Sequence, residues 1–290
     1  MNLNENYFYK KKIERLKMEA KEFLKKNLLE NGVKYFGNVS MSYLECVVNQ
    51  WMDDDNIPKC RFKIINYLLP NANKILDMAS GCGAAVFYGL KSNYDMYGIE
   101  PEEWKNEFIK IKAKENNYPD EWIQRFYKGV GESLPFPNDF FDCVMSNQTL
   151  EHVEDVYFCI NEMIRVCKSG GGVHLNCPDY RGTFEGHYML PWLPLFPKFL
   201  AKMYLKMLNK PTLGIDYINY TTKPQILKIL QDIKKNNPSI ILKIIDLKRT
   251  RRPTHILERI LPYCVLNIIN YFRICFKSGI SINLFIYIKK

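Results

Sequence analysis

Apolar and polar positions follow two different spacings along the chain and so divide it into parts. Over residues 7–30 the apolar residues recur every three or four positions among Lys and Glu, which predicts an amphipathic helix that Asn31-Gly32 ends. The same spacing predicts helices over residues 42–52 and 59–69. We therefore expect residues 1–70 to form an N-terminal helical cap.

Beyond the cap, short apolar runs alternate with helical segments, a pattern typical of a βαβ series with a mainly parallel sheet. Strands are predicted over residues 74–78, 96–100, 125–128, 141–147, 172–177, 240–248 and 281–290, and helices over 84–91 and 156–167. A further helix is predicted with Thr222 as its N-cap and Pro224 in its first turn. We therefore expect an α/β fold with a core over residues 71–178, followed by an insertion and the completion of the sheet over residues 179–290.

The composition is that of a large globular protein: 290 residues, 47% of them hydrophobic and 25% charged. A formal charge of +10 favours an acidic partner, which could be nucleic acid, anionic lipid or a phosphorylated substrate, or else reflects a solvated Lys-rich surface. Nine Cys form no C-x-x-C pair and only four His accompany them, so we expect reduced thiols and no metal site. Neither a signal peptide nor a membrane-spanning run is recognisable, so we expect a cytoplasmic protein.

The stretch K-I-L-D-M-A-S-G-C-G, which begins at Lys74, turns a predicted buried strand directly into a helix. Such a tight reversal needs small side chains and leaves backbone amides free near the helix start. It would build a pocket at the carboxyl edge of the sheet, where ligands bind in open α/β folds. Val86 stands where a dinucleotide fingerprint has its third glycine, which disfavours a nicotinamide cofactor.

Two acidic residues lie at the ends of consecutive predicted strands. Asp77 comes just before the glycines, where it is poorly placed for a pyrophosphate but well placed for a cationic amine. Glu100 ends the next strand and could accept both hydroxyls of a ribose as a bidentate carboxylate. Together the two acids predict a site for an adenosine that carries a positively charged tail.

This order of residues resembles the class I S-adenosylmethionine-dependent methyltransferases, and residues 74–178 are most similar to the branch of ubiquinone and sugar methyltransferases. The family motif D-x-G-x-G-x-G begins here at Asp77, with Ala79 in place of one glycine, and the ribose acid of the family matches Glu100. The family loop G-D-A-E-x-L-P-F appears as G-V-G-E-S-L-P-F, in which Val130 replaces the acid that meets the adenine amino group. The resemblance implies a Rossmann-like fold, S-adenosylmethionine as the cofactor and methyl transfer as the activity.

The resemblance also implies a set of cofactor-binding residues, of which the last two would lie on the sulfonium side. They are Asp77, Ala79, Gly81, Gly83, Glu100, Glu132, Ser133, Asn147 and Gln148. With no acid at position 130, adenine would be recognised by backbone groups near residues 131–133 or by another side chain.

The methyl acceptor is expected to contact residues 179–220 and the front helices, because these flank the side of the sheet where the methyl group would lie. An alcohol acceptor needs a base, and His187 with its partner Glu185 could take the proton as the new bond forms, without a metal. Alternatively, these two residues only hold a Pro-rich loop together. Tyr180, Arg181, Tyr188 and Trp192 lie nearby in the sequence and form a mixture able to hold a polar ring. Of the other histidines, His152 is interpreted as a packing residue or, alternatively, as a group near the transferred methyl. His174 is interpreted as structural and His255 as part of a basic surface cluster.

These features predict O-methylation of a sugar, a sugar nucleotide or another phosphorylated glycan precursor, by resemblance to methyltransferases of bacterial surface-polysaccharide synthesis. A basic, then apolar segment over residues 249–276 could bind phosphate, rest peripherally on an anionic membrane, or pack on the sheet as a helix. Its predicted contacts are Lys248, Arg249, Arg251 and Arg252 for anions, and Leu257, Leu261, Leu266 and Ile269 for lipid. Alternatives are a methyltransferase for a quinone-like or lipid acceptor and a non-catalytic binding protein of the same fold. Nucleic acid is not expected as a partner, because no RNA-binding module is recognisable.

Overall fold

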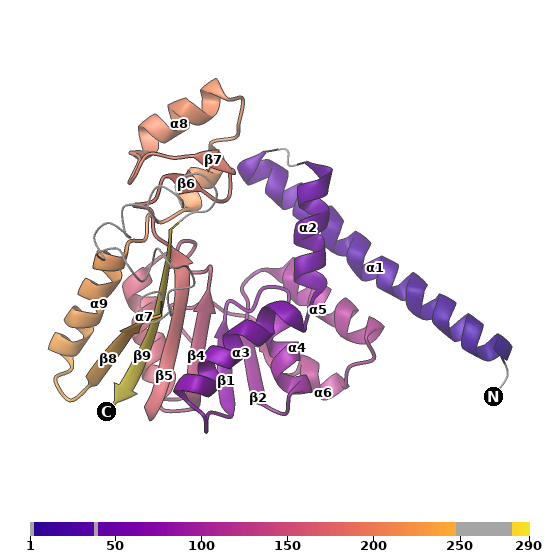
Figure 1. The fold of residues 1–290 in the computed structure, drawn as a ribbon, viewed down its shortest axis with the longest axis horizontal. Coiled ribbons are helices and arrows are strands. Elements are labelled where there is room, and N and C mark those ends of the chain that lie inside the picture. Colours follow the sequence, from indigo (N-terminus) through magenta and orange to yellow (C-terminus); the bar gives the residue numbers. More distant parts are fainter. Residues whose placement is uncertain (1–2, 38–39, 248–279) are drawn as a thin grey trace, which may run out of the picture.

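The computed structural model describes residues 3–37, 40–247 and 280–290 (Figure 1). The predicted basic and apolar segment over residues 249–276 lies outside the described residues, and so do Lys248, His255, Cys264 and Cys275. The other seven cysteines, which are described, are all free thiols, as expected. Among the described residues, no helix has the length and apolar character that a membrane crossing requires.

A seven-stranded sheet forms the centre of the molecule, with the strand order β3-β2-β1-β4-β5-β9-β8. The strands are β1 (Lys74–Met78), β2 (Asp95–Ile99), β3 (Phe126–Tyr127), β4 (Phe141–Asn147), β5 (Cys167–Pro178), β8 (Ile241–Asp246) and β9 (Ser281–Lys289). β1 to β5 run parallel, whereas β9 is antiparallel to both of its neighbours. The predicted mainly parallel, Rossmann-like sheet is therefore confirmed, and its last two strands come from the end of the chain.

The strand order reverses at β1, which pairs with β2 on one side and with β4 on the other. Asp77 lies opposite Gly98 in β2 and opposite Met145 in β4. The carboxyl ends of these three strands therefore meet at one edge of the sheet, and in such folds this switch point opens a crevice for ligands.

Helices cover both faces of the sheet (Figure 1). They are α3 (Asn56–Leu68), α4 (Ala84–Lys91), α5 (Glu103–Glu115), α6 (Asp120–Ile123), α7 (Val156–Val166) and α9 (Lys223–Asn236). On one face, Met163 of α7 and Leu230 of α9 pack in the largest apolar cluster. On the other, Phe62 of α3 and Val86 of α4 belong to a second cluster. α9 starts where predicted, with a capping box between Thr222 and Gln225.

Several predicted boundaries differ from the structure, most clearly at the end of α1 and at the junction of α7 and β5. α1 (Leu3–Phe36) continues through Asn31-Gly32, because the Asn31 amide donates a hydrogen bond back to the Asn27 carbonyl (2.9 Å) inside the helix. The helix ends instead at Gly37, whose φ of +86° is the left-handed geometry of a helix C-terminus. In the second case, α7 ends one residue earlier than predicted and β5 begins already at Cys167, which pairs with Phe141 before a register shift.

A small module, here called the insertion module (residues 184–217), stands above the carboxyl ends of the parallel strands (Figure 1). It contains the hairpin of β6 (Phe184–Glu185) and β7 (Leu190–Pro191), the helix α8 (Lys198–Met207) and the 3-10 helix η1 (Leu213–Tyr217). Its own apolar cluster is built around Tyr188, Trp192 and Leu205. The Tyr188 hydroxyl donates to the Tyr35 carbonyl (3.1 Å), which ties the module to the end of α1. α2 (Met41–Met52) completes the front helices.

Candidate active site

A cavity of about 790 Å³ opens at the carboxyl edge of the sheet. Its wall includes the glycine turn after β1, the end of β2, the loop over residues 129–132 and the segment that follows β4. Seven predicted cofactor residues line it: Asp77, Ala79, Gly81, Glu100, Glu132, Asn147 and Gln148. The cavity also contacts Arg61 and Lys105, which the sequence did not indicate as site residues, and His152, for which a place near the methyl group was the alternative interpretation.

The glycine turn has a left-handed backbone at every second residue. Ala79, Gly81 and Gly83 have φ values of 61°, 55° and 78°. Left-handed geometry is unfavourable for a residue with a Cβ atom, so the structure explains why the related motif has glycine where this chain has Ala79. Gly83 does not line the cavity; a Cβ atom there would lie 3.0 Å from the Phe126 ring and 3.1 Å from Phe87, so this glycine allows the turn to pack closely.

Glu100 is buried and already holds part of the turn. Its carboxylate accepts hydrogen bonds from the backbone N–H of Gly81 (2.9 Å) and of Glu102 (3.1 Å), and Lys105 Nζ lies 3.4 Å away. A carboxylate accepts about four hydrogen bonds, so a ribose with two hydroxyls must displace one of these donors. Lys105 can leave, because it also donates to Glu102 (2.5 Å). Burial raises the pKa of Glu100, and Lys105 with the backbone donors opposes this shift.

Asp77 is 3% exposed, and burial raises the pKa of its carboxyl to about 7, against the opposing charge of Arg61 and with a further increase from Glu100. A cation bound next to it would favour the ionised form and lower this pKa. The two acids and the cavity volume therefore fit an adenosine with a cationic tail, the ligand that the sequence predicts for this edge.

The loop over residues 129–133 differs in part from the prediction. Glu132 lines the cavity, but its Oε1 accepts hydrogen bonds from the backbone of Glu154 (2.7 Å) and Asp155 (3.2 Å), so one oxygen holds the neighbouring loop. Ser133 does not line the cavity, whereas Val130 does and is 47% exposed. The contacts of adenine thus stay a prediction.

Asn147 is the last residue of β4, Gln148 follows it directly, and both line the same cavity. The Asn147 Oδ1 accepts a hydrogen bond from the Asn176 amide (3.1 Å), and Gln148 has a left-handed backbone with φ of 55°. The backbone N–H of Gln148 donates to the Asn176 carbonyl (2.7 Å), which helps to hold this strained residue in place. Strain of this kind costs about 1–3 kcal/mol and clusters at functional sites.

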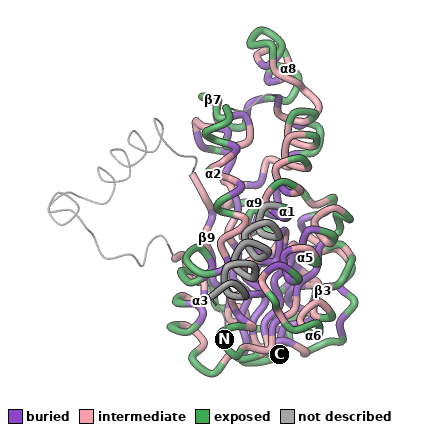
Figure 2. Tube along the Cα trace, turned by 90° about the vertical axis from the view of Figure 1, so that its right-hand side faces the viewer, coloured by how far each residue is buried: buried purple, intermediate pink, exposed green. Residues whose placement is uncertain are grey.

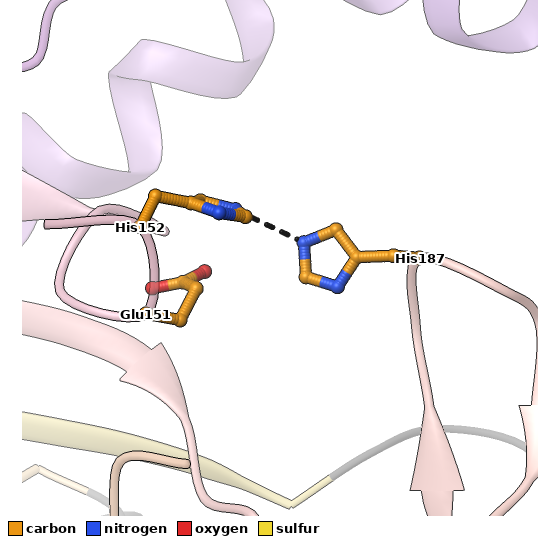
Figure 3. Close-up of side chains that lie close together, drawn as sticks. All are labelled: Glu151, His152 and His187. Atoms are coloured by element: carbon orange, nitrogen blue, oxygen red, sulfur yellow. Dashed lines mark hydrogen bonds between the residues drawn. The ribbon is translucent and has the colours of Figure 1, made fainter. Parts of the chain in front are cut away.

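A chain of polar groups leads from the insertion module to the cavity. His187 Nδ1 lies 2.6 Å from Glu185 Oε1, and His187 Nε2 lies 3.1 Å from His152 Nε2 (Figure 3). Of the three residues, only His152 lines the cavity. The interpretation of His152 as a packing residue did not anticipate this placement, because His152 and His187 lie 35 residues apart and meet only through the fold.

The module fixes Glu185 and His187 from several sides. Glu185 is 1% exposed, and its Oε2 accepts the backbone N–H of Tyr188 (2.7 Å). The Tyr180 hydroxyl lies 3.4 Å from Glu185 Oε1. The ring of Phe36, at the end of α1, stacks on His187 with the ring centroids 5.1 Å apart. The front helices thus contribute directly to the orientation of this histidine.

The two histidines differ in their affinity for protons. Burial would lower the pKa of His187, but the hydrogen bond and charge of Glu185, with the charge of Glu151, outweigh burial and raise it. His152 is exposed along the cavity, but the protein atoms around its ring displace part of its water, and this desolvation with the charge of His187 lowers its pKa to about 4. A proton that enters this pair therefore resides on His187.

Glu151 is fully buried beside the two histidines, and neither of its carboxylate oxygens has a hydrogen-bond partner among the described residues (Figure 3). Burial raises its pKa to about 7. The ligand atoms of Glu151, His152 and His187 lie within 4.8 Å of one another, so this group could also hold a cation. The sequence did not indicate it, since no two of its three ligands have a spacing typical of metal sites.

Three aromatic residues near His187 do not have the predicted role. Tyr180, Tyr188 and Trp192 are 4–5% exposed and none lines the cavity. Tyr188 and Trp192 belong to the apolar cluster of the insertion module, and the Tyr180 ring stacks on Tyr220. Arg181 is paired with the Asp179 carboxylate (2.6 Å). His174, in contrast, is structural as predicted: it is buried within β5 and lies 2.9 Å from Asn283 in β9.

Known proteins resemble the part of the chain that contains the cavity. Residues 76–175 match the family described as "Methyltransferase domain". An uncharacterized methyltransferase of Mycobacterium leprae is 32% identical over 122 residues, which are 41% of this chain and 42% of the relative. The ubiquinone biosynthesis O-methyltransferase of Pelagibacter ubique is 24% identical over 246 residues, 80% of this chain and 96% of the relative. The solved structure of YcgJ from Bacillus subtilis is 18% identical with a TM-score of 0.45, and the match covers 76% of this chain and 92% of that one.

The chain spans 42–44% of the length of the Mycobacterium relatives that match it. The segment in common contains the glycine turn, Glu100, β4 and His152, and it occupies the centre of the mainly parallel sheet. The two acids of the cavity fit the ribose and the amine of S-adenosylmethionine. Residues 76–175 therefore resemble a methyltransferase domain, and the cavity that they help to form agrees with the class I S-adenosylmethionine-dependent methyltransferases.

Proposed function

We propose that the protein transfers a methyl group from S-adenosylmethionine to a hydroxyl oxygen of a sugar, a sugar nucleotide or another phosphorylated glycan precursor. The observation that carries the choice of oxygen is the chain Glu185–His187–His152, which connects a buried carboxylate to the cavity. An amine or a carboxylate acceptor would need less help from a base than an alcohol does.

The residues of the sheet edge bind and orient the donor, which supplies a methyl group on a positively charged sulfur. Asp77 pairs with the amine of the donor in its ionised form. Glu100 accepts the ribose hydroxyls after Lys105 moves to Glu102. The turn at Ala79 and Gly81 keeps the backbone close to the ligand, and Asn147 and Gln148 border the region where the methyl group lies. Alignment of this kind supplies most of what a displacement reaction requires.

The histidine pair moves the proton that the acceptor loses. As the acceptor oxygen bonds to the methyl carbon, its proton passes to His152 Nδ1, and the proton on His152 Nε2 passes to His187 Nε2. His187 then holds the positive charge, and Glu185 stabilises it through the 2.6 Å hydrogen bond at Nδ1. This direction agrees with the raised pKa of His187 and the lowered pKa of His152. The assignment of hydrogens to ring nitrogens follows from these hydrogen-bond partners.

A second candidate is transfer to a quinone-like or lipid acceptor. It is favoured by the similarity to the ubiquinone biosynthesis O-methyltransferase of Pelagibacter ubique, which extends over 80% of this chain. Both candidates use the same donor site and the same base, so they differ only in the acceptor that reaches His152.

The test begins with calorimetric titration of the full chain with S-adenosylmethionine, with NAD as the comparison ligand. Saturable binding of S-adenosylmethionine alone is expected. Transfer of a labelled methyl group is then measured on nucleotide sugars and on quinone-like phenols, with and without EDTA. Transfer to the phenols only would replace the glycan proposal by the second candidate, and binding without transfer to any acceptor would indicate a binding protein. Loss of transfer in EDTA would indicate that Glu151, His152 and His187 bind a metal ion instead of carrying the proton of the acceptor.

A further inference from the structure

The outer face of α8 is apolar, although nothing in the described part of the chain covers it. Phe199, Met203 and Met207 are 66%, 59% and 80% exposed. The buried residues of the same helix, Ala201 and Leu205, are each 0% exposed. Figure 2 shows α8 at the far end of the molecule, with exposed and partly exposed residues around it.

The helical period makes these two sets of residues point in opposite directions. Residues advance by about 100° per position, so Phe199 and Ala201 lie about 160° apart around the axis. The same holds for Met203 and Leu205. A helix at a protein surface normally turns its polar side to water. α8 instead has one apolar row on the module and a second apolar row pointing away from it.

Basic residues border the outward row and no acid interrupts it. Lys198, Lys202 and Lys206 each precede one of the exposed apolar residues, so they form the adjacent row. From residue 188 to residue 215 the chain contains four Lys and no Asp or Glu. Lys202 is paired with Asp216 of η1 (2.6 Å), whereas Lys198 and Lys206 are exposed.

The apolar surface continues into the loop that precedes α8. Leu193 and Leu195 are 61% and 48% exposed, and Met189 at the tip of the β6–β7 hairpin is 51% exposed. Apolar side chains that gather on one end of a protein in this way mark an interaction site rather than an ordinary surface.

We propose that this surface, composed of α8 and residues 189–195, docks on a bilayer that contains anionic lipid. Amphipathic helices that lie in the membrane interface combine Phe, Leu and Met side chains on one side with Lys next to them. Acidic head groups complement Lys198 and Lys206, while the acyl region beneath them accepts Phe199, Met203 and Met207.

The docking surface belongs to the module that also holds the base. Glu185 lies in β6 and His187 in the turn of the same hairpin, and Tyr188 and Trp192 pack with Leu205 of α8 in one cluster. His187 would therefore keep a fixed position relative to a membrane that is bound by α8. Resting on the proposed function, this arrangement indicates an amphiphilic acceptor, whose hydroxyl-bearing head group enters the cavity while its apolar part stays in the bilayer.

The test is co-sedimentation of the full chain with vesicles of phosphatidylcholine alone and with equimolar phosphatidylcholine and phosphatidylglycerol. Binding is expected to the mixed vesicles only, and to weaken as salt is raised. The double variant Phe199→Gln with Met203→Gln is expected to bind at least tenfold more weakly. Its matched control is Tyr67→Gln with Phe158→Gln, which removes two exposed aromatic rings on α3 and α7 and is expected to bind as the parent does.

A variant that lacks two lysines tests the contribution of the positive charges separately from that of the apolar side chains. Lys198→Gln with Lys206→Gln is expected to weaken binding to the mixed vesicles by about thirtyfold, since each Lys near an anionic surface contributes about 1 kcal/mol. Lys234→Gln with Lys235→Gln, in the last turn of α9, is the matched control. Equal binding by the parent and the α8 variants, or no binding by the parent, would overturn the proposal.

Two further measurements keep the outcomes distinct. Sedimentation velocity without lipid is expected to give a monomer; a dimer that the α8 variants abolish would assign this surface to a second copy of the chain and overturn the proposal. The affinity for S-adenosylmethionine is measured on the same samples. If the parent binds S-adenosylmethionine but no vesicles, only the docking surface is rejected. If the parent does not bind S-adenosylmethionine, the proposed function is rejected.

Discussion

The proposed donor side and the proposed acceptor side of the cavity are built in different ways. On the donor side, Asp77, Ala79, Gly81 and Glu100 lie within one strand–turn–helix–strand unit, and the register of β1 against β2 fixes their positions. On the acceptor side, His152 comes from the loop after β4, His187 from the insertion module and Phe36 from the end of α1. Local chain geometry thus makes the donor site, and contacts between distant segments make the acceptor site.

This difference implies that the two sides can be damaged separately. The strongest expected effect is on turnover: His187→Gln should lower kcat by about 10²–10⁴-fold, because His152, whose pKa is low, then has no partner to which it can pass the proton of the acceptor. Affinity for S-adenosylmethionine, measured by calorimetry, should not change. Asp216→Asn, which removes an acid of the same module that pairs with Lys202, serves as the control. An unchanged kcat in the His187 variant would show that His187 takes no part in removing the proton of the acceptor.

The second prediction concerns the donor side only. Glu100→Ala should raise the Kd for S-adenosylmethionine more than tenfold, since charge-assisted hydrogen bonds of about 1.5–3 kcal/mol are lost. Glu103→Gln is the matched control, because Glu103 is an exposed acid at the start of α5 that pairs with Lys128 outside the cavity. If both variants bind the donor like the parent, Glu100 is not part of the site.

The third prediction uses the raised pKa of Asp77, which lies at about 7. The carboxyl is protonated below this pH and cannot pair with the amine of the donor, so the affinity should fall about tenfold per pH unit below 7 and level off above it. Titrations between pH 5.5 and 8.5 (roughly one and a half units either side of the pKa) measure this dependence. Asp77→Asn should bind weakly at every pH; a slope that survives in this variant would assign the dependence to another group such as Glu100.

The smallest expected effect is on stability. Ala79→Gly should raise the free energy of unfolding by about 0.5–1 kcal/mol, because glycine adopts a φ of 61° without strain. Ala84→Gly, in the first turn of α4, should lower it or leave it unchanged. Urea unfolding midpoints compare the two variants. A loss of stability in Ala79→Gly would mean that the methyl group packs usefully in the turn.

Sequence patterns predicted the sheet well because each strand is a short apolar run bounded by clear turn residues. They failed at Asn31-Gly32, where a side-chain hydrogen bond to Asn27 and packing of α1 on the body keep the helix intact. They also misjudged Tyr188 and Trp192, since an aromatic residue near a site looks the same in sequence whether it faces a ligand or forms a core. Burial depends on neighbours that lie far away in the chain.

The sequence by itself determined the methyltransferase core: the glycine turn, the acids that follow β1 and β2, and the order of strands over residues 71–178. These features depend on local spacing, and a strand that ends in a tight turn places its acid at the sheet edge whatever surrounds it. Only the tertiary structure decided that His152 meets His187, that Glu151 is buried beside them, and that α8 turns Phe199 and Met203 to solvent. The physical reason is that hydrogen bonds between separate loops, and the direction of a helix face, are set by packing against other elements.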